Sequence, residues 1–513
     1  MLTKSLRLLP LIAILLCTTS ISAAQEPAAP RLIMLDPVPA LLNGPAVTTD
    51  VNVLATKGRA VQGAATDAAS EVVFRIPAAS AGEQFIITVF NDQGQQSQSS
   101  AEDGGLGPIG TTTFTASQLT VVAASTSAGP RAFAIYGSPI DFPRPEGQDG
   151  NSTERFITIQ VTAVDTGLTS NTSVTLLRPP LVLIHGLWGS PQSWSNFTPL
   201  LGDPRFTISE ADYSNVIGPQ IRSYTPAYPS WAIGSLANSP ASALGFSYNA
   251  PSVLSQISGF IKSFKTGSNA ASAQVAGVQA DIVAHSMGGD ITRTLPTIKN
   301  FYSSNTFALG VVHKAITIAT PHWGSPLATK LLASNNECVR GILATNGSPS
   351  FTSVTFLNGT KASGAVADLQ GDGFGGGLSA ALRRLQNPIA HPLPTALIQG
   401  IESQSQLDGL DTSPTAAFIR LFCFGNSLAG DLTSSGWPTI FNQDSDSIVP
   451  ALSAVAGLSG GVVVEGVIHS ASAEALGFGP PAELDADGGV PNTVIDLLNT
   501  PVTSSTYIPL PQP

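Results

Sequence analysis

A change in residue pattern at Arg178-Pro179-Pro180 divides the chain into two parts that are expected to fold differently. Before this point the sequence is rich in Thr, Val, Ala and Ser. Short runs that alternate apolar with polar residues lie at 71–76, 84–90, 119–123 and 155–164. This alternation predicts strands that bury one face, and turn-rich stretches separate them. We therefore expect residues 25–177 to form a smaller all-β domain, an immunoglobulin-like sandwich.

After the boundary, strand-like and helix-like segments alternate, which predicts an α/β fold. Strand-like runs lie at 181–184, 281–284 and 315–319, and a helical pattern lies at 251–264. Between about 325 and 436 the alternation gives way to Gly-, Ser- and Pro-rich sequence that is longer than an ordinary connection. We expect this stretch to be a cap inserted into an α/β domain at 178–500. The Pro-rich tail, 501–513, is expected to be extended.

The first 24 residues have the form of a cleavable leader. Lys4 and Arg7 precede an apolar run that ends at Cys17, and Ser22-Ala23-Ala24 resembles a signal-peptidase site. The alternative, a membrane anchor, is disfavoured because the run is shorter than the roughly 20 residues that span a bilayer. The pattern predicts a secreted protein, extracellular or periplasmic, that is cleaved near Ala24.

Removal of this leader leaves two cysteines, Cys338 and Cys423. An even pair in an exported protein favours a disulfide, and two separately buried thiols are the alternative. The two positions bracket most of the expected cap. A bond between them would join its two ends.

The overall charge and the absence of metal-binding motifs exclude several classes of function. The chain has 23 Lys and Arg against 34 Asp and Glu, a formal charge of -11, which argues against nucleic-acid binding. It has neither an H-E-x-x-H motif nor paired C-x-x-C motifs, so no metal and no cofactor are expected in the catalytic site. A structural calcium ion remains open.

The segment 284–289 (AHSMGG) follows a predicted strand and precedes a helix-like segment. A serine at such a turn can be exposed as a nucleophile, provided that small residues two before and two after it allow the strand and the helix to approach. Ala284 and Gly288 occupy those positions. We predict that Ser286 is the catalytic nucleophile, and the alternative is an ordinary Ser/Gly turn.

Three motifs, HGLWG (185–189), AHSMGG (284–289) and TPHWGS (320–325), resemble those of the α/β-hydrolase superfamily, and in particular those of bacterial secreted lipases and esterases. The resemblance covers about 178–500. Ala284 replaces the commoner glycine of the G-x-S-x-G motif, as in some bacterial lipases. The resemblance implies an α/β-hydrolase fold with a cap or lid insertion.

A serine hydroxyl attacks efficiently only when a general base takes its proton. Five of the six histidines lie in turns, before a strand, in the expected cap or too close to Ser286: His185, His285, His313, His322 and His391. The resemblance implies the chain order serine, acid, histidine. We therefore expect His469, which follows the strand-like run 461–464, to be the base.

The acid that orients this base should lie between Ser286 and His469, at the end of a strand. The apolar run 439–441 is followed by a loop rich in Asp and Ser. Asp446 matches the D-x-x-V-P pattern of the family, so we choose it over Asp444. The alternative for both is an Asx turn.

Two backbone N–H groups are expected to stabilise the charge that develops on the substrate oxygen. One belongs to Met287, just after the nucleophile. The resemblance places the other at Leu187, in the His-Gly turn. Trp188 and Trp323 lie beside these turns and are candidates for lining an acyl pocket, with plain packing as the alternative.

Within the expected cap, apolar residues recur at helical spacing from Leu378 to Leu385, after a glycine-rich stretch at 371–377. This pattern is typical of an amphipathic lid that opens at a lipid surface, and equally of a small packed helix.

These features predict a secreted lipase or esterase that cleaves carboxylic esters through an acyl-enzyme. We expect a monomer that acts on an ester, lipid or polyester substrate, contacts a lipid interface transiently and binds no nucleic acid. Cleavage of thioesters or amides and acyl transfer also remain open. Two further alternatives are an aliphatic polyester depolymerase and a catalytically inactive binding protein with a hydrolase fold.

Overall fold

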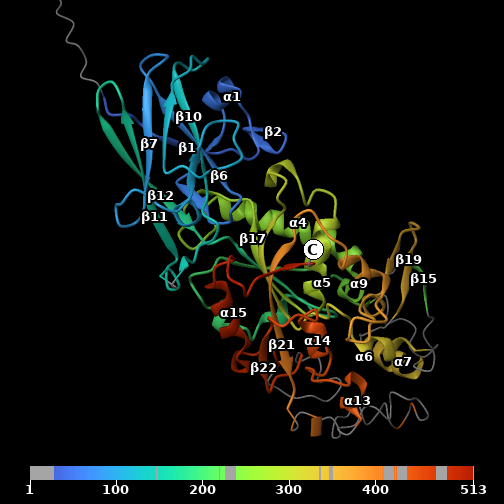
Figure 1. Ribbon diagram of the computed structural model, residues 1–513. Helices are drawn as coiled ribbons and strands as arrows, with labels where there is room; N and C mark the ends of the chain where they lie inside the picture. Colours follow the sequence, from blue (N-terminus) through green and yellow to red (C-terminus); the bar gives the residue numbers. More distant parts are fainter. Residues whose placement is uncertain are drawn as a thin grey trace, which may run out of the picture.

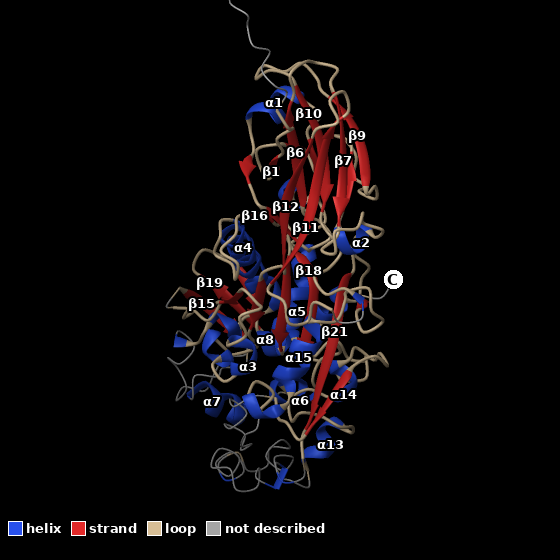
Figure 2. Cartoon of the chain, turned by 90° about the vertical axis from the view of Figure 1, so that its left-hand side faces the viewer, coloured by secondary structure: helices blue, strands red, loops and turns tan. Residues whose placement is uncertain are grey.

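The computed structural model (Figure 1) describes most of the chain after the expected leader. The described residues are 28–145, 148–218, 220–225, 238–333, 337–345, 351–403, 405, 407–408, 421, 423, 436–469 and 482–511. The predicted leader lies outside these residues. The fold is mixed α/β, with one parallel sheet and separate, mainly antiparallel sheets, as the change of pattern at Arg178 predicts. Figures 1 and 2 show the all-β part at one end of the molecule and the α/β part at the other.

The all-β part consists of two sheets with a common core. The first has the order β4 (Arg59–Ala60), β1 (Ile33–Asp36), β6 (Glu71–Pro77), β10 (Arg131–Gly137) and β8 (Gly105–Gly107). The second has the order β16 (Val275–Ala276), β5 (Gly63–Ala65), β12 (Thr169–Leu177), β11 (Glu154–Ala163), β7 (Gln84–Phe90) and β9 (Gln118–Val122). Phe74 from the first sheet and Ile87 and Ile159 from the second are fully buried in one cluster. Burial alternates along β11 as its sequence predicts.

Smaller elements complete this part. They are α1 (Val51–Thr56), α2 (Ser100–Asp103) and the hairpin of β2 (Leu42–Asn43) and β3 (Ala46–Val47).

One strand of the second sheet comes from beyond the Arg178 boundary. β16 pairs in parallel with β5, so residues 275–276 extend a sheet whose other strands all precede residue 178. Just after β16, the Asp67 carboxylate accepts hydrogen bonds from the N–H groups of Val278 and Gln279, each at 3.0 Å. The two parts of the chain are thus joined by backbone pairing as well as by the connection at 178–180.

The α/β part is built on a parallel sheet. Its order is β14 (Ile208–Ala211), β13 (Leu181–Ile184), β17 (Ala280–His285), β18 (Val312–Ile318), β21 (Leu393–Ile401) and β22 (Val462–Glu465). β23 (Ile508–Leu510) pairs antiparallel with β21, so the end of the expected extended tail belongs to this sheet. Every residue of β17 and β18 is buried, as expected for central strands covered on both faces.

Helices cover both faces of this sheet. On one face, Val182 and Ile184 share a core with α4 (Phe246–Lys265) and α5 (Met287–Thr294). On the other, Leu181 and Leu183 share a core with α3 (Thr198–Leu201) and α15 (Val490–Leu498). The two-residue period of a strand therefore divides β13 between two cores.

Only part of the stretch 325–436, expected to be a cap, lies outside the central sheet. β21 falls inside it and belongs to the central sheet. β19 (Ser353–Phe356) and β20 (Lys361–Ser363) form a separate small sheet with β15 (Ile221–Thr225). The described helices in and near this stretch are α6 (Pro326–Leu332), α7 (Glu337–Thr345), α8 (Ala365–Asp368), α9 (Ala380–Leu385), α13 (Trp437–Phe441) and α14 (Ala451–Ala454).

The apolar stripe considered as a lid corresponds to α9. Leu382 and Leu385 are buried in the core shared with α5, whereas Arg383 and Arg384 are exposed. In this structure α9 is a short packed helix. The structure also forms the predicted disulfide between Cys338 and Cys423, across 85 residues of sequence.

Short 3-10 helices connect several of these elements, at Pro191–Trp194, Ala241–Ala243, Leu295–Thr297, Ser304–Thr306 and Ala486–Gly488. Within the described residues, none of the helices combines the length and the apolar character needed to cross a bilayer.

Candidate active site

Ser286 occupies the sharp turn between β17 and α5. Its φ is 56° and its ψ is −132°, a left-handed conformation that is uncommon for a residue with a side chain. The start of α5 packs closely against the end of the neighbouring strand β13: a Cβ on Gly288 would lie 2.4 Å from the carbonyl oxygen of Ile184. The turn is held by neighbouring groups, because Thr320 Oγ1 donates to the Ser286 carbonyl at 2.9 Å and Ser286 N–H donates to Ile318 at 2.8 Å.

The structure brings together the three side chains expected to form the triad. Nε2 of His469 lies 2.7 Å from Ser286 Oγ, and Nδ1 of His469 lies 2.7 Å from Asp446 Oδ2. A carboxylate can only accept, so the Nδ1 atom carries the proton and Nε2 is left to accept from the serine hydroxyl. All three residues are buried.

Backbone groups fix the Asp446 carboxylate. Its Oδ1 accepts from the N–H groups of Ile448 at 2.9 Å and Val449 at 2.7 Å, and its backbone carbonyl accepts from His469 N–H at 2.9 Å. The side chain therefore serves both as an Asx turn within its own loop and as the partner of the imidazole. The two interpretations of the sequence are compatible.

The element before Asp446 differs from the prediction. Residues 437–441 form helix α13, not the strand expected at 439–441. Pro438 is in the first turn of α13, where a proline favours a helix start. The strand that supports Asp446 is β21: Glu402, directly after it, donates its N–H to the Ser445 carbonyl at 2.8 Å and accepts from Ser445 Oγ. Burial raises the pKa of Glu402 to about 7.

The two backbone N–H groups expected to form the oxyanion hole, those of Leu187 and Met287, have no hydrogen-bond partner among the described residues. The His-Gly turn lies directly against the serine, because a Cβ on Gly186 would be 2.6 Å from Ser286 Cβ. His185 itself stacks on Tyr213, with ring centroids 3.9 Å apart. Burial lowers the pKa of His185 to about 4, so this ring is neutral and structural at neutral pH.

The candidate pocket tryptophans have different surroundings. Trp188 adopts a φ of 56° and packs between the main core and the small β15–β19–β20 sheet. The ring of Trp323 fills the space beside Gly457, where an added Cβ would approach it to 1.8 Å. Its backbone N–H donates to Ser453 Oγ at 3.0 Å. Packing against the described residues accounts for Trp323.

Three other histidines have partners elsewhere in the fold. His313 lies in β18 between Asp281, at 2.7 Å, and the Ile140 carbonyl, at 2.8 Å. His322 Nδ1 accepts from Arg293 at 2.9 Å. The ring of His391 lies 5.6 Å from that of Tyr302.

Two residues beside the triad were not expected in this role. Glu483 is fully buried, and its Oε2 lies 3.3 Å from His285 Nε2 and 3.9 Å from His469 Nδ1. His285 Nε2 also lies 2.8 Å from the His469 carbonyl. Burial and the neighbouring Asp446 raise the pKa of Glu483 well above its ordinary value. The sequence carries no motif around Glu483, and the place of His285 beside Ser286 in the chain does not indicate its contact with the His469 carbonyl.

His285, His469 and Glu483 also have donor atoms within 4.8 Å of one another, the spacing of a metal site. However, His469 Nδ1 faces Asp446 and His285 Nε2 faces a carbonyl oxygen. These side chains are accounted for by hydrogen bonds, and a metal would have to break them.

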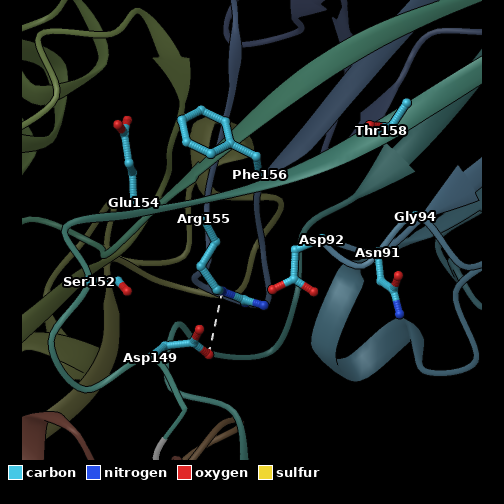
Figure 3. A pocket seen from close by; sticks show the side chains of 9 residues that line it. All are labelled: Asn91, Asp92, Gly94, Asp149, Ser152, Glu154, Arg155, Phe156 and Thr158. Atoms are coloured by element: carbon cyan, nitrogen blue, oxygen red, sulfur yellow. Dashed lines mark ion pairs between the residues drawn. The ribbon is translucent and has the colours of Figure 1, made fainter.

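A pocket of about 380 Å³ in the all-β part has a different character (Figure 3). Its lining includes Asp92, Asp149 and Arg155, and Arg155 points between the two carboxylates. Arg144 pairs with Asp92 at 2.9 Å and with Asp149 at 2.8 Å, and Arg155 lies 3.9 Å from Asp149. Ion pairing within the domain accounts for these charges.

Comparisons with known proteins find only distant similarity. No protein-family model matches the chain, and no curated protein matches it. Among solved structures, it is similar to the Bacillus licheniformis lipase BlEst2 in its propeptide form, with 14% identity and a TM-score of 0.35, over 63% of this chain and 50% of that one. The chain therefore spans half the length of that lipase.

A second similar structure is the Staphylococcus hyicus lipase, with 14% identity and a TM-score of 0.32, over 63% of this chain and 95% of that one. A third is an extracellular α/β-hydrolase from a Paenibacillus species, with 12% identity and a TM-score of 0.22, over 43% and 76% of the two chains. These values are low, and what the site does is inferred from its own geometry.

Proposed function

We propose that this chain is a secreted serine hydrolase of the α/β-hydrolase type that cleaves carboxylic esters. The observation that carries the proposal is the hydrogen-bonded series from Ser286 through His469 to Asp446, with both contacts at 2.7 Å. Nucleophilic catalysis by serine requires this arrangement of nucleophile, base and orienting acid. Export is part of the proposal, supported by the leader-like sequence at 1–24 and by the disulfide.

In the first half of the reaction, Ser286 Oγ attacks the ester carbonyl carbon while His469 Nε2 takes the hydroxyl proton. The carbonyl oxygen becomes an oxyanion and accepts hydrogen bonds from the N–H groups of Leu187 and Met287. When the carbonyl re-forms, the ester C–O bond breaks and His469 returns the proton to the leaving alcohol. Asp446 holds the imidazole in the tautomer that these transfers need and stabilises its charged form.

In the second half, water attacks the acyl-enzyme. His469 takes one proton from this water, and collapse of the second tetrahedral intermediate releases the carboxylic acid. The proton then returns to Ser286 Oγ, so the enzyme is regenerated. The bond broken in each half is a C–O bond, and no redox cofactor is needed.

The test is hydrolysis of p-nitrophenyl esters from acetyl to palmitoyl by the purified protein and its Ser286→Ala variant. We expect hydrolysis by the wild type and loss of at least about 1000-fold in kcat in the variant. Ser195→Ala, at an exposed serine, is the matched control and should retain activity. Activity that survives in Ser286→Ala, or no activity on any ester, would contradict the proposal.

A further inference from the structure

Glu483 is held next to the triad by the backbone. Its N–H donates to the Ile468 carbonyl at 2.8 Å, next to an isolated parallel bridge between Ile468 and Ala482. This pairing places Glu483 alongside His469. The side chain has no exposed surface.

The carboxyl group of Glu483 faces three members of the site. Its Oε2 lies 3.3 Å from His285 Nε2 and 3.9 Å from His469 Nδ1. Its other oxygen, Oε1, has no hydrogen-bond partner among the described residues, and the neighbouring Asp446 carboxylate raises the pKa of Glu483. A fourth titratable group, Glu402, reaches this cluster through Ser445, the neighbour of Asp446.

Two neighbouring buried carboxyl groups disfavour being ionised together, so one of them holds a proton. Asp446 accepts from two backbone N–H groups and from the imidazole, so its oxygens are already supplied with donors. Among the described residues no Lys or Arg pairs with Glu483, and burial disfavours its charged form. The proton therefore belongs to Glu483.

His285 connects the same carboxyl to the backbone of the base. Its Nε2 faces two acceptors, the His469 carbonyl at 2.8 Å and Glu483 Oε2, so this nitrogen carries a proton. Burial lowers the pKa of His285 well below its ordinary value, so the ring is neutral. Glu483 thus reaches the main chain of His469 through His285.

We propose that Glu483 is a positioning residue of this active site, a neutral carboxylic acid that orients the His469 backbone through His285. The proposal rests on the proposed function, because it assigns a role in the activation of Ser286. A neutral acid here holds His285 without adding a second negative charge beside the imidazole of His469. A second carboxylate would compete with Asp446 for the Nδ1 proton.

The experiment measures the rate at which a fluorophosphonate labels Ser286, as a function of pH, in the wild type, Glu483→Gln and Glu483→Leu. Labelling forms a P–O bond to Ser286, breaks the P–F bond and passes the serine proton to His469, so it reports activation without an ester substrate. The fall in labelling rate at low pH, the acid limb of the profile, reports protonation of His469. Glu465→Gln, which removes an exposed acid at the end of β22, is the matched control.

We expect Glu483→Gln to label at nearly the wild-type rate with the same acid limb, because a neutral amide replaces a neutral acid and its oxygen can still accept from His285. Glu483→Leu should label about 10-fold more slowly or worse, because the contact with His285 is lost and the triad loses alignment. If this variant does not fold, Glu483→Met replaces it as an apolar side chain of matched length.

Two results would overturn the proposal. If Glu483 were ionised, its replacement by Gln would remove a negative charge 3.9 Å from His469 Nδ1 and move the acid limb about one pH unit lower. If the apolar variants labelled as fast as the Gln variant, Glu483 would not position the triad. Wild-type protein that is labelled at Ser286 but hydrolyses no ester would contradict the proposed function alone. The role of Glu483 would then still be decided by the labelling rates of the wild type and the Glu483 variants.

Discussion

The ammonium group of Lys314 lies 2.8 Å from Asp141 Oδ2, and both side chains are buried at the boundary between the two parts of the chain. Lys314 belongs to β18, in the centre of the parallel sheet, whereas Asp141 follows β10 of the all-β part. Asp141 Oδ2 also accepts from Val502 N–H at 2.8 Å. Together with the pairing of β16, this ion pair links the all-β part to the centre of the parallel sheet.

Replacing Asp141 with Asn should therefore destabilise the whole molecule. The substitution preserves shape but leaves the Lys314 ammonium buried without a counter-charge, which typically costs about 3–5 kcal/mol. Urea unfolding followed by far-UV circular dichroism measures the loss, and Asp165→Asn, at an exposed position, is the control. A change below about 1 kcal/mol would mean that solvent reaches Lys314.

Gly186→Ala should strongly lower activity while the fold remains. The added Cβ would lie 2.6 Å from Ser286 Cβ and 3.1 Å from its Oγ, so the nucleophile or the His-Gly turn must move. A displacement of this size costs about 100-fold in kcat. Gly259→Ala is the matched control, because a Cβ there meets nothing within 4 Å. Full ester hydrolysis by Gly186→Ala would show that the turn adapts.

Asp446→Asn should lower kcat by about 1000- to 10,000-fold with little change in KM. An amide can donate its NH₂ group to Nδ1 of His469, which favours the tautomer with the proton on Nε2. A protonated Nε2 cannot accept the proton of the Ser286 hydroxyl. Asp444→Asn separates the two candidate acids, because Asp444 is exposed and should be replaceable. A larger loss in Asp444→Asn than in Asp446→Asn would reverse the assignment.

The features that could be predicted from the sequence are local ones. The turn at Ser286 depends on small residues two positions away, and Cys338 and Cys423 form a pair by elimination. Burial along β11 follows from its period of two. Each of these depends on neighbours in the sequence or on a count, so a pattern is enough to reveal it.

The features that were missed depend on long-range contacts. β16 is two residues long, and only its pairing with β5 makes it a strand. Residues 439–441 are too few to show a period, so a strand and a helix could not be told apart. Glu483 lies beside His469 because of the bridge between Ile468 and Ala482, a contact that no local pattern specifies.

Loss of the disulfide should lower the free energy of unfolding. The bond closes a loop across 85 residues, and a loop of that size corresponds to about 4 kcal/mol of restricted unfolded-state entropy. The double variant Cys338→Ser, Cys423→Ser should unfold at lower urea concentration than the oxidised wild type. Dithiothreitol should shift the wild type toward the variant and leave the variant unchanged. Equal stability of the oxidised wild type and the double variant would contradict this prediction.

Glu71 should make the stability of the all-β part dependent on pH. It is buried at the start of β6, its Oε2 has no hydrogen-bond partner among the described residues, and burial raises its pKa to about 8. A raised carboxyl pKa means that the folded state binds more protons than the unfolded state between about pH 4.5 and 8. Stability is therefore lost as the pH rises through this window, because the folded protein must then ionise a buried group or release it to solvent.

Glu71→Gln removes this titration and keeps the shape of the side chain. The difference in unfolding free energy between Glu71→Gln and the wild type should shift in favour of the variant by roughly 2 kcal/mol or more from pH 5 to pH 8.5. Urea titrations at the two pH values measure it, and Glu465→Gln, at an exposed acid, should show no such shift. An equal difference in unfolding free energy at both pH values would contradict the prediction. It would mean that the Glu71 carboxyl has the same pKa in the folded and unfolded states, because water reaches it in the folded protein.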